Sequence, residues 1–150
     1  MALFNHATKE VTLKVVYDGP ALSGKTANLR FMHDRLSFRT KGRLVSLTTQ
    51  ADRTLFFDFV PLEAGGLPGM RTRIQVYTVP GQVYYEGTRR MVLKGCDAVV
   101  FVADSQAAML EANAESLRGL RQNLLASEVV PSIPQVIQYN KRDAATALPG

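Results

Sequence analysis

The sequence predicts an α/β fold in which helices cover a mostly parallel sheet. Two observations carry this prediction. Short apolar runs typical of buried strands alternate along the 150 residues with segments whose apolar side chains recur every three or four positions. The motifs that could bind a ligand directly follow the strand segments, as they do at the carboxyl-terminal edge of such sheets. The length fits a single domain with a modest core.

Five segments are expected to be strands. They are Val11–Tyr17, Leu55–Val60, Arg71–Tyr77, Ala98–Ala103 and Gln135–Tyr139. The fourth is apolar throughout, which is typical of a parallel strand with both faces covered. A loop rich in Pro and Gly separates the second from the third and is too short for a crossover helix, so we expect that pair to be antiparallel.

Three helices are expected, one after Lys25, one near Tyr84 and one after Asp104-Ser105. The third is the clearest, because its apolar residues lie three or four positions apart. They are Leu110, Ala114, Leu117, Leu120 and Leu124. Asp and Ser side chains cap helix N-termini, so Asp104 and Ser105 are expected to begin this helix. The predicted order is β-α-β-β-α-β-α-β.

The segment Gly19–Thr26, GPALSGKT, matches the phosphate-loop pattern G-x-x-x-x-G-K-[ST] completely and lies between the first strand and the first helix. Its two glycines allow backbone angles at which consecutive N–H groups point at a phosphate, and the helix adds the positive end of its dipole. We expect Lys25 to reach the β- and γ-phosphates and the Thr26 hydroxyl to bind Mg²⁺. The predicted nucleotide contacts are Gly19, Leu22, Ser23, Gly24, Lys25, Thr26 and Ala27. The alternative is an ordinary Gly-containing turn.

The segment Asn140-Lys141-Arg142-Asp143 follows the last strand. Guanine presents an N1–H and an amino group side by side, and one carboxylate can accept from both. We therefore expect Asp143 to read guanine, Asn140 to brace the base pocket and the Lys141 stem to lie over the ring. By itself N-K-x-D also occurs as an ordinary loop, and its distance downstream of the phosphate loop favours the guanine interpretation.

Two further segments could meet the γ-phosphate. Gly81 can offer its backbone N–H, and Gln82 can orient the attacking water. Thr54 could close over Mg²⁺ and the γ-phosphate, and Arg53 could bring its guanidinium to the negative charge that develops during hydrolysis. The predicted catalytic residues are thus Gln82 and Arg53, and the predicted metal ligands are Thr26 and Thr54. Incidental loop positions are the alternative for Gln82 and Arg53.

The net charge of +5 draws attention to a basic cluster after the phosphate loop, formed by Arg30, Arg35, Arg39, Lys41 and Arg43. No aromatic residues are interleaved there at a spacing suited to base stacking, so a solvated face is favoured over an acidic partner or membrane surface, and nucleic acid is not expected. No apolar run is long enough to span a membrane, and the N-terminus lacks a signal peptide. We expect a cytoplasmic protein in which Cys96 is a buried thiol.

In this order, the phosphate loop, the segment around Gly81 and the N-K-x-D motif resemble the Ras-like small GTPases. The stretches Asp52–Phe59, Tyr77–Gln82 and Val102–Ser105 resemble, more specifically, the MglA family of bacterial gliding and cell-polarity GTPases, and the similarity covers essentially the whole chain. The resemblance implies a three-layer Ras-like sandwich that binds GTP or GDP with Mg²⁺. It also implies a switch that hydrolyses GTP slowly alone and acts through polarity or motility effectors, in the cytoplasm or at the pole or membrane through partners. In such a switch Arg53 would be an arginine finger, completed together with Gln82 when a dimeric, MglB-like activator of the roadblock fold docks.

Two features bear on how complete this site is. Thr78, like its counterpart in the family, stands where eukaryotic relatives carry a Mg²⁺-linked Asp, so another group is expected to hold the metal through waters, with Asp52 and Asp58 as candidates. The sequence also ends at Gly150, before a final strand and helix of the family. We therefore expect residues 1–150 to form a GTPase domain truncated at its C-terminus, with Gln135–Tyr139 at the sheet edge. A shortened, non-catalytic nucleotide-binding or docking module is the alternative function.

Overall fold

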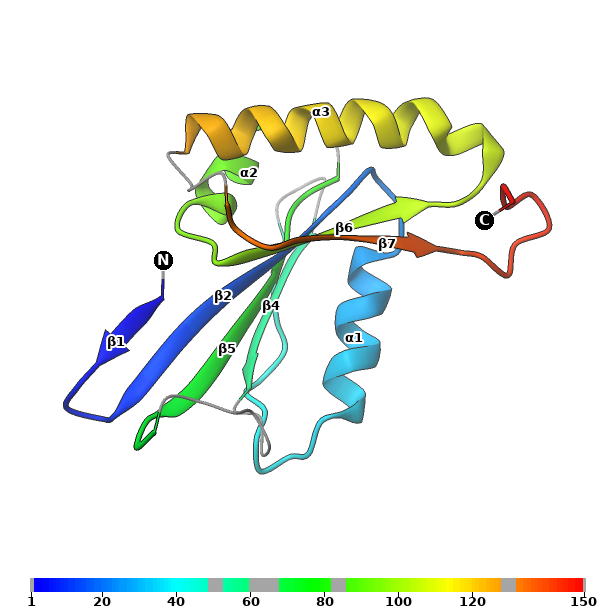
Figure 1. Ribbon diagram of the computed structural model, residues 1–150. Coiled ribbons are helices and arrows are strands. Elements are labelled where there is room, and N and C mark those ends of the chain that lie inside the picture. The colour runs from blue at the N-terminus through cyan, green and yellow to red at the C-terminus, as the bar shows by residue number, and fades with distance from the viewer. Residues whose placement is uncertain (1, 49–52, 60–67, 82–85, 128–131, 150) are drawn as a thin grey trace.

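The computed structural model describes residues 2–48, 53–59, 68–81, 86–127 and 132–149 (Figure 1). In this part of the chain the sheet has seven strands. They are β1 (Leu3–Asn5), β2 (Glu10–Asp18), β3 (Val45–Thr48), β4 (Arg53–Phe59), β5 (Arg71–Thr78), β6 (Ala98–Asp104) and β7 (Gln135–Asn140). The helices are α1 (Lys25–Arg35), α2 (Glu86–Leu93), the short 3₁₀ helix η2 (Ala107–Met109) and α3 (Leu110–Ala126).

The centre of the sheet is parallel, as predicted. The strands follow the order β3-β4-β5-β2-β6-β7, and β1 pairs antiparallel with β2. Strand β2 runs parallel to both β5 and β6, and β6 runs parallel to β7. The predicted antiparallel pair is confirmed as β4 and β5, with Phe56 opposite Tyr77. This topology brings the carboxyl ends of β2, β5, β6 and β7 to one edge of the sheet, where the motifs lie.

Helices cover both faces of the sheet, so the chain forms the predicted three layers (Figure 1). On the face of α2 and α3, Val16 and Phe101 pack with Leu93 and Leu120. On the face of α1, Tyr17 and Val102, the next residues along β2 and β6, pack with Leu29. Neighbouring residues of one strand thus enter opposite cores, which explains why the central strands are apolar throughout. Cys96 is a buried free thiol in the first of these cores, as expected.

Some elements differ from those predicted. Strands β1 and β3 were not predicted, and α3 begins at Leu110 rather than directly after Ser105. The reason for the later start is that the Asp104 carboxylate accepts from the Gln106 backbone N–H at 3.1 Å, inside the loop that leads into η2. Met109 occupies the N-cap of α3 without a side-chain hydrogen bond. Helix α2 is described from Glu86, and Tyr84 lies outside the described residues.

Strand β7 is the last strand on its side of the sheet, as predicted, and in the described part of the chain it pairs only with β6. Its apolar side chains Val136, Ile137 and Tyr139 are exposed. None of the described helices is long and apolar enough to cross a membrane.

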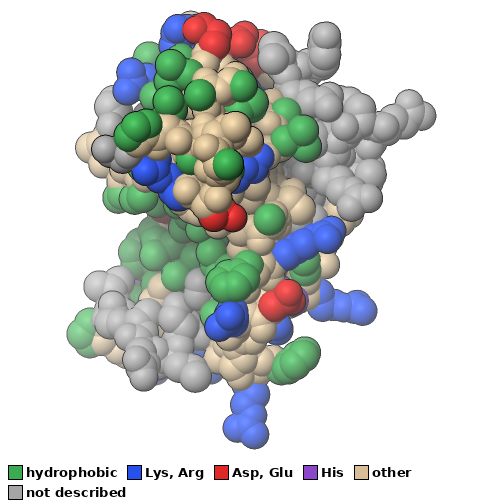
Figure 2. Space-filling model, turned by 90° about the vertical axis from the view of Figure 1, so that its right-hand side faces the viewer, with side chains coloured by type: hydrophobic (Ala, Val, Ile, Leu, Met, Phe, Trp, Pro, Cys, Tyr) green, Lys and Arg blue, Asp and Glu red, His purple; other side chains and the backbone are tan. Residues whose placement is uncertain are grey.

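Most of the basic cluster after the phosphate loop is exposed, namely Arg30, Arg35, Arg39 and Arg43, and Lys41 is half-buried. Two of its members lie over neighbouring rings: Arg35 stacks on Phe31, and Lys41 on Phe38. On the face shown in Figure 2, the Lys and Arg side chains at the lower end stand apart from one another. The exposure of most of the cluster is compatible with the solvated basic face favoured from the sequence.

Candidate functional site

The phosphate loop joins the end of β2 to the start of α1. Gly19 and Gly24 have φ angles of 146° and 102°, which favour glycine. A Cβ atom would also collide with the Val102 carbonyl oxygen at Gly19 and with the Asn140 side-chain amide at Gly24. Both glycines are therefore needed for the path of the backbone as well as for the space around it.

The loop holds a cation inside its curve. Lys25 is buried, and its Nζ donates to the carbonyl oxygens of Gly19 at 2.8 Å and Pro20 at 2.7 Å. The Ser23 hydroxyl is also buried and has no hydrogen-bond partner among the described residues. A buried ammonium group and an unsatisfied hydroxyl in the same loop suit an anion with several oxygen atoms. Of the other predicted contacts, Thr26 is half-buried, while Leu22 and Ala27 are exposed.

Gly81 lies directly against this loop. A Cβ atom on Gly81 would lie 2.6 Å from Ala21 Cα and 2.9 Å from Lys25 Nζ, so no side chain fits there. The ends of β5 and β2 are joined by a hydrogen bond from the Val79 N–H to the Tyr17 carbonyl at 3.1 Å. The carboxyl end of β5 thus brings the Gly81 backbone to the lysine of the phosphate loop.

The N-K-R-D segment touches the phosphate loop from the other side. Asn140 ends β7, and its Nδ2 donates to the Ser23 carbonyl at 2.8 Å. Gln138, two residues earlier, donates to Asn28 Oδ1 of α1 at 2.8 Å. Asp143 is exposed, as a residue that meets a ligand from solvent must be. Two motifs 117 positions apart are thus joined in one site.

Asp104 belongs to this site and was predicted only as a helix cap. It ends β6 opposite Asn140 and accepts from Lys141 Nζ at 2.7 Å. Burial of Asp104 raises its pKa, but the hydrogen bonds from Lys141 and Gln106 outweigh burial, and the net pKa lies below its usual value. The carboxylate is therefore ionised and fixes the Lys141 ammonium. A charged residue at the carboxyl end of an apolar strand was the signal for this role.

The chain after Asp143 folds back on the loop after β6. Leu148 N donates to the Ser105 carbonyl at 2.8 Å, and Ala107 N donates to the Thr146 carbonyl at 2.9 Å. The Thr146 hydroxyl adds a bond to Gln106 Oε1 at 3.0 Å. These bonds hold the N-K-R-D loop from its far end.

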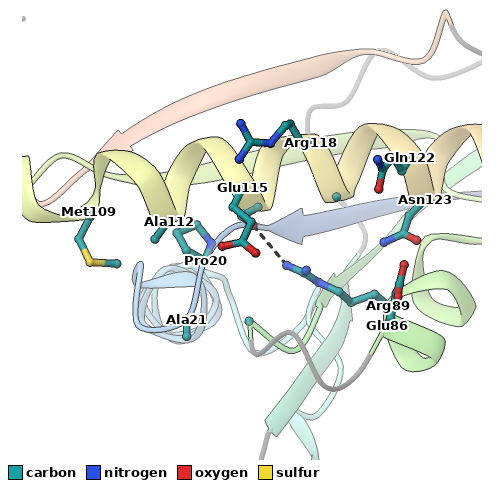
Figure 3. Close-up of a pocket in the computed structure, with 13 residues that line it drawn as sticks. Pro20, Ala21, Glu86, Arg89, Met109, Ala112, Glu115, Arg118, Gln122 and Asn123 are labelled. Atoms are coloured by element: carbon teal, nitrogen blue, oxygen red, sulfur yellow. Dashed lines mark hydrogen bonds between the residues drawn. The ribbon is translucent and has the colours of Figure 1, made fainter.

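A second buried charge lies behind the phosphate loop and was missed in the sequence. Asp18, the last residue of β2, is fully buried, and its Oδ1 accepts from the Gly19 N–H at 2.6 Å and from Arg89 Nη2 at 3.0 Å. Arg89, on α2, also donates to the Ser116 hydroxyl of α3 at 3.3 Å (Figure 3). Burial raises the pKa of the Asp18 carboxyl, against the opposing effect of Arg89. An Asp that ends an apolar strand was again the signal.

The residues predicted to act on the γ-phosphate are described only in part. Arg53 and Thr54 are the first residues of β4 and not, as expected, part of a loop before it. Because Phe56 pairs with Tyr77, the start of β4 lies at the same edge of the sheet as Gly81. Gln82 and Asp52 lie outside the described residues.

The register of β4 also bears on how a metal ion could be held. Asp58 pairs with Gln75, three residues before the end of β5, so it is set back about 10 Å from the loop edge. This position disfavours Asp58 as the group that replaces the Mg²⁺-linked Asp. Within the described ranges, no group of three or more His, Cys, Asp or Glu side chains could hold a metal.

Comparison with known proteins agrees with this geometry. No family model matches the sequence. The chain is 52% identical over 149 residues to the mutual gliding-motility protein MglA of Myxococcus xanthus (strain DK1622). The aligned region covers 99% of this chain and 76% of that relative. Identity at this level over nearly the whole sequence shows that the chain belongs to the MglA family of Ras-like small GTPases, which bind GTP and GDP and hydrolyse GTP.

Proposed function

We propose that residues 1–150 form one GTPase domain that controls cell polarity or gliding motility through nucleotide-dependent binding of effectors. The printed name of the Myxococcus relative supports the link to gliding motility. The observation that carries the proposal is the 2.8 Å hydrogen bond between Asn140 and the Ser23 carbonyl, which joins the base-reading loop to the phosphate loop. We further propose that the switch acts in the cytoplasm and reaches the cell pole through its partners.

Guanine recognition is assigned to Asp143, Asn140 and Lys141. The carboxylate of Asp143 would accept from the N1–H and the amino group of guanine, a pair of donors that adenine does not present. Asn140 would brace the pocket through its hydrogen bond to Ser23. The stem of Lys141 would lie over the base, with its ammonium group held by Asp104. Each of these residues binds or orients the base, and none takes part in the chemistry.

The phosphates are assigned to the loop Gly19–Ala27. The buried Lys25 ammonium and the unsatisfied Ser23 hydroxyl are the observations that fit a polyphosphate with its cation. Thr26 and Thr54 would hold Mg²⁺, which, when bound, neutralises charge on the β- and γ-phosphates. Gly81 would donate its backbone N–H to the γ-phosphate and so distinguish GTP from GDP.

Hydrolysis is assigned to Gln82 and Arg53. Gln82 would orient the attacking water, and Arg53 would stabilise the negative charge that develops on the transferred phosphoryl group. We propose that the chain turns over slowly alone, and that docking of an MglB-like, dimeric activator of the roadblock fold completes this arrangement. Loss of the γ-phosphate then releases the start of β4, which carries Thr54, and the segment that carries Gly81, and so changes the surface offered to effectors.

Isothermal titration with Mg²⁺ and either GDP or ADP tests the proposal. We expect tight binding of GDP and weak binding of ADP. Asp143→Ala should weaken GDP binding at least about a hundredfold, because two charge-assisted hydrogen bonds are lost. Asp34→Ala, an exposed carboxylate on α1, is the matched control and should leave binding unchanged. Equal affinity for GDP and ADP would contradict the proposal, and absence of heat with both would favour the docking module.

A further inference from the structure

The buried pair of Asp18 and Arg89 has no role in the function proposed above. Both residues are almost inaccessible, with exposed fractions of 0% and 7%. Taking two charges out of water is costly, so an ion pair of this kind is a weak source of net stability. Its position directly behind the phosphate loop suggests another role.

The pair connects three parts of the molecule. Asp18 belongs to the strand that enters the phosphate loop, Arg89 to α2, and the Ser116 hydroxyl that also accepts from Arg89 belongs to α3. Figure 3 shows the Arg89 side chain reaching from α2 toward α3, across the cavity that it lines together with Pro20 and Ala21 of the loop. Helix α2 is also the first described element after Gly81, the proposed γ-phosphate contact.

The Gly19 carbonyl is shared by two cations. Lys25 Nζ donates to it at 2.8 Å, and Arg89 Nη2 lies at the longer distance of 3.5 Å. A phosphate that binds in the loop draws the Lys25 ammonium toward its own oxygens. The Gly19 carbonyl then loses a donor, and Arg89 is positioned to replace it. Phosphate binding in the loop would thereby change the hydrogen bonding of the Arg89 guanidinium.

The ion pair also has unused hydrogen-bonding capacity. Asp18 Oδ2 and Arg89 Nε are both buried, and neither has a partner in the described part of the chain. A carboxylate and a guanidinium can form two parallel hydrogen bonds, which would satisfy both atoms. A cavity of about 630 Å³ between α2, α3 and the loop is lined in part by Arg89, Ser116 and Gly81. The Arg89 side chain therefore borders open space in which it could turn to bring Nε to Asp18 Oδ2. The pair could therefore change from its present single hydrogen bond to an arrangement with two parallel hydrogen bonds.

We propose that the Asp18–Arg89 pair transmits occupancy of the phosphate loop to helix α2, which makes Arg89 a positioning residue for the γ-phosphate contact at Gly81. This inference rests on the proposed GTPase function. Gly81 lies close against Ala21 and Lys25 of the phosphate loop and lines the same cavity as Arg89, so we expect a small displacement of α2 at this cavity to change how the Gly81 N–H meets the γ-phosphate. Loss of the pair should weaken binding of GTP more than binding of GDP, because only GTP uses that contact.

The test compares dissociation constants for GDP and for GppNHp, a GTP analogue that is not hydrolysed, both with Mg²⁺. In Arg89→Ala, affinity for GppNHp should fall at least about fivefold more than affinity for GDP, a typical coupling between sites. Arg118→Ala is the matched control, because Arg118 lines the same cavity but forms an exposed pair with Glu111. This control should keep the ratio of the two affinities within about twofold, as an exposed pair contributes little.

Asp18→Asn keeps the side-chain volume and tests the other partner. It should shift the same ratio in the same direction, and the Asp18→Asn/Arg89→Ala double variant should shift it no further than the larger single change. A purely structural pair would lower thermal stability and leave the ratio unchanged, which would overturn the inference. If Arg89→Ala does not fold, the ratio measured for Asp18→Asn decides in the same way. Absence of guanine preference in the unmodified chain would instead contradict the proposed function.

Discussion

The ammonium group of Lys141 lies 2.7 Å from the Asp104 carboxylate, at the point where the ends of β6 and β7 meet. Only one of the two residues belongs to a recognisable nucleotide-binding motif. The other reaches it because parallel strands of similar register end at the same edge of the sheet. Asp104 is therefore a supporting residue of the base site, and its removal should affect nucleotide binding without any contact to the base.

Asp104→Asn tests this relationship. The amide keeps the volume but gives up the charge that attracts Lys141, and it cannot accept from Lys141 and Gln106 through both side-chain atoms. We expect GDP affinity to fall about five- to tenfold, in line with the loss of a charge-assisted hydrogen bond at a partly exposed group. Titration calorimetry with GDP measures the change, and Glu111→Gln, in an exposed pair with Arg118, is the control. Unchanged GDP affinity in Asp104→Asn would show that Lys141 needs no such anchor.

Gly81→Ala should impair binding of the GTP form. A Cβ atom would approach Ala21 Cα to 2.6 Å and Ala21 N to 2.7 Å, and these backbone atoms cannot move aside as the end of a flexible side chain could. We expect GppNHp affinity to fall at least about tenfold, because displacement by an overpacked methyl group typically costs 1–3 kcal/mol, with a smaller effect on GDP. Gly87→Ala is the matched control, because a Cβ atom there meets nothing within 4 Å. On α2 this control should bind normally and gain up to about 1 kcal/mol of stability. Equal affinities of Gly81→Ala and the unmodified protein for GppNHp would contradict the assigned contact.

Much of the fold could be predicted from local patterns. Strands β2 and β6 could be recognised because consecutive residues such as Val16 and Tyr17 enter two different cores, and a continuous apolar run results. Strand β1 could not, because Leu3–Asn5 is short and exposed and exists through its pairing with β2. The start of α3 was misplaced because the Asp104 side chain is used in a loop and not as a cap.

In the candidate site, too, some residues could be predicted from the sequence and others could not. Phosphate-loop and N-K-R-D residues lie within short contiguous motifs, so their chemistry could be predicted without knowing the fold. Arg89 could not be identified, because its partner Asp18 is 71 positions away and the pair forms only when α2 packs against the end of β2. Arg89 is distinguished from other arginines by its burial, and burial depends on tertiary packing, which the sequence pattern does not show.

Arg53→Ala and Gln82→Leu should separate binding from catalysis. Both residues are proposed to act only when charge develops during hydrolysis, so GTP and GDP affinities should change little in either variant. Hydrolysis stimulated by the activator should fall at least about a thousandfold for Arg53→Ala, the scale found for arginine fingers in Ras and Gα. Single-turnover rates with and without the activator measure the effect. Normal stimulated rates in either variant would refute its assigned role.

The far end of the sheet offers a test of stability against pH. Glu10 and Arg73 form two parallel hydrogen bonds between β2 and β5, at 2.8 and 3.1 Å. The hydrogen bond from Arg73 holds the pKa of Glu10 below its usual value in the folded chain. A carboxyl group with a depressed folded-state pKa stabilises the fold above its unfolded-state pKa, about 4.3, and loses that contribution as pH falls through the folded-state pKa.

Glu10→Gln should therefore lower the free energy of unfolding at pH 7 by about 1 kcal/mol or less, because the pair is partly exposed. The difference between the variant and the unmodified protein should shrink as pH falls below 4, as measured by urea unfolding at each pH. The exposed Glu111→Gln serves as the control, and a difference for Glu10→Gln that stays constant from pH 7 to pH 3 would mean that the pair makes no charge-dependent contribution.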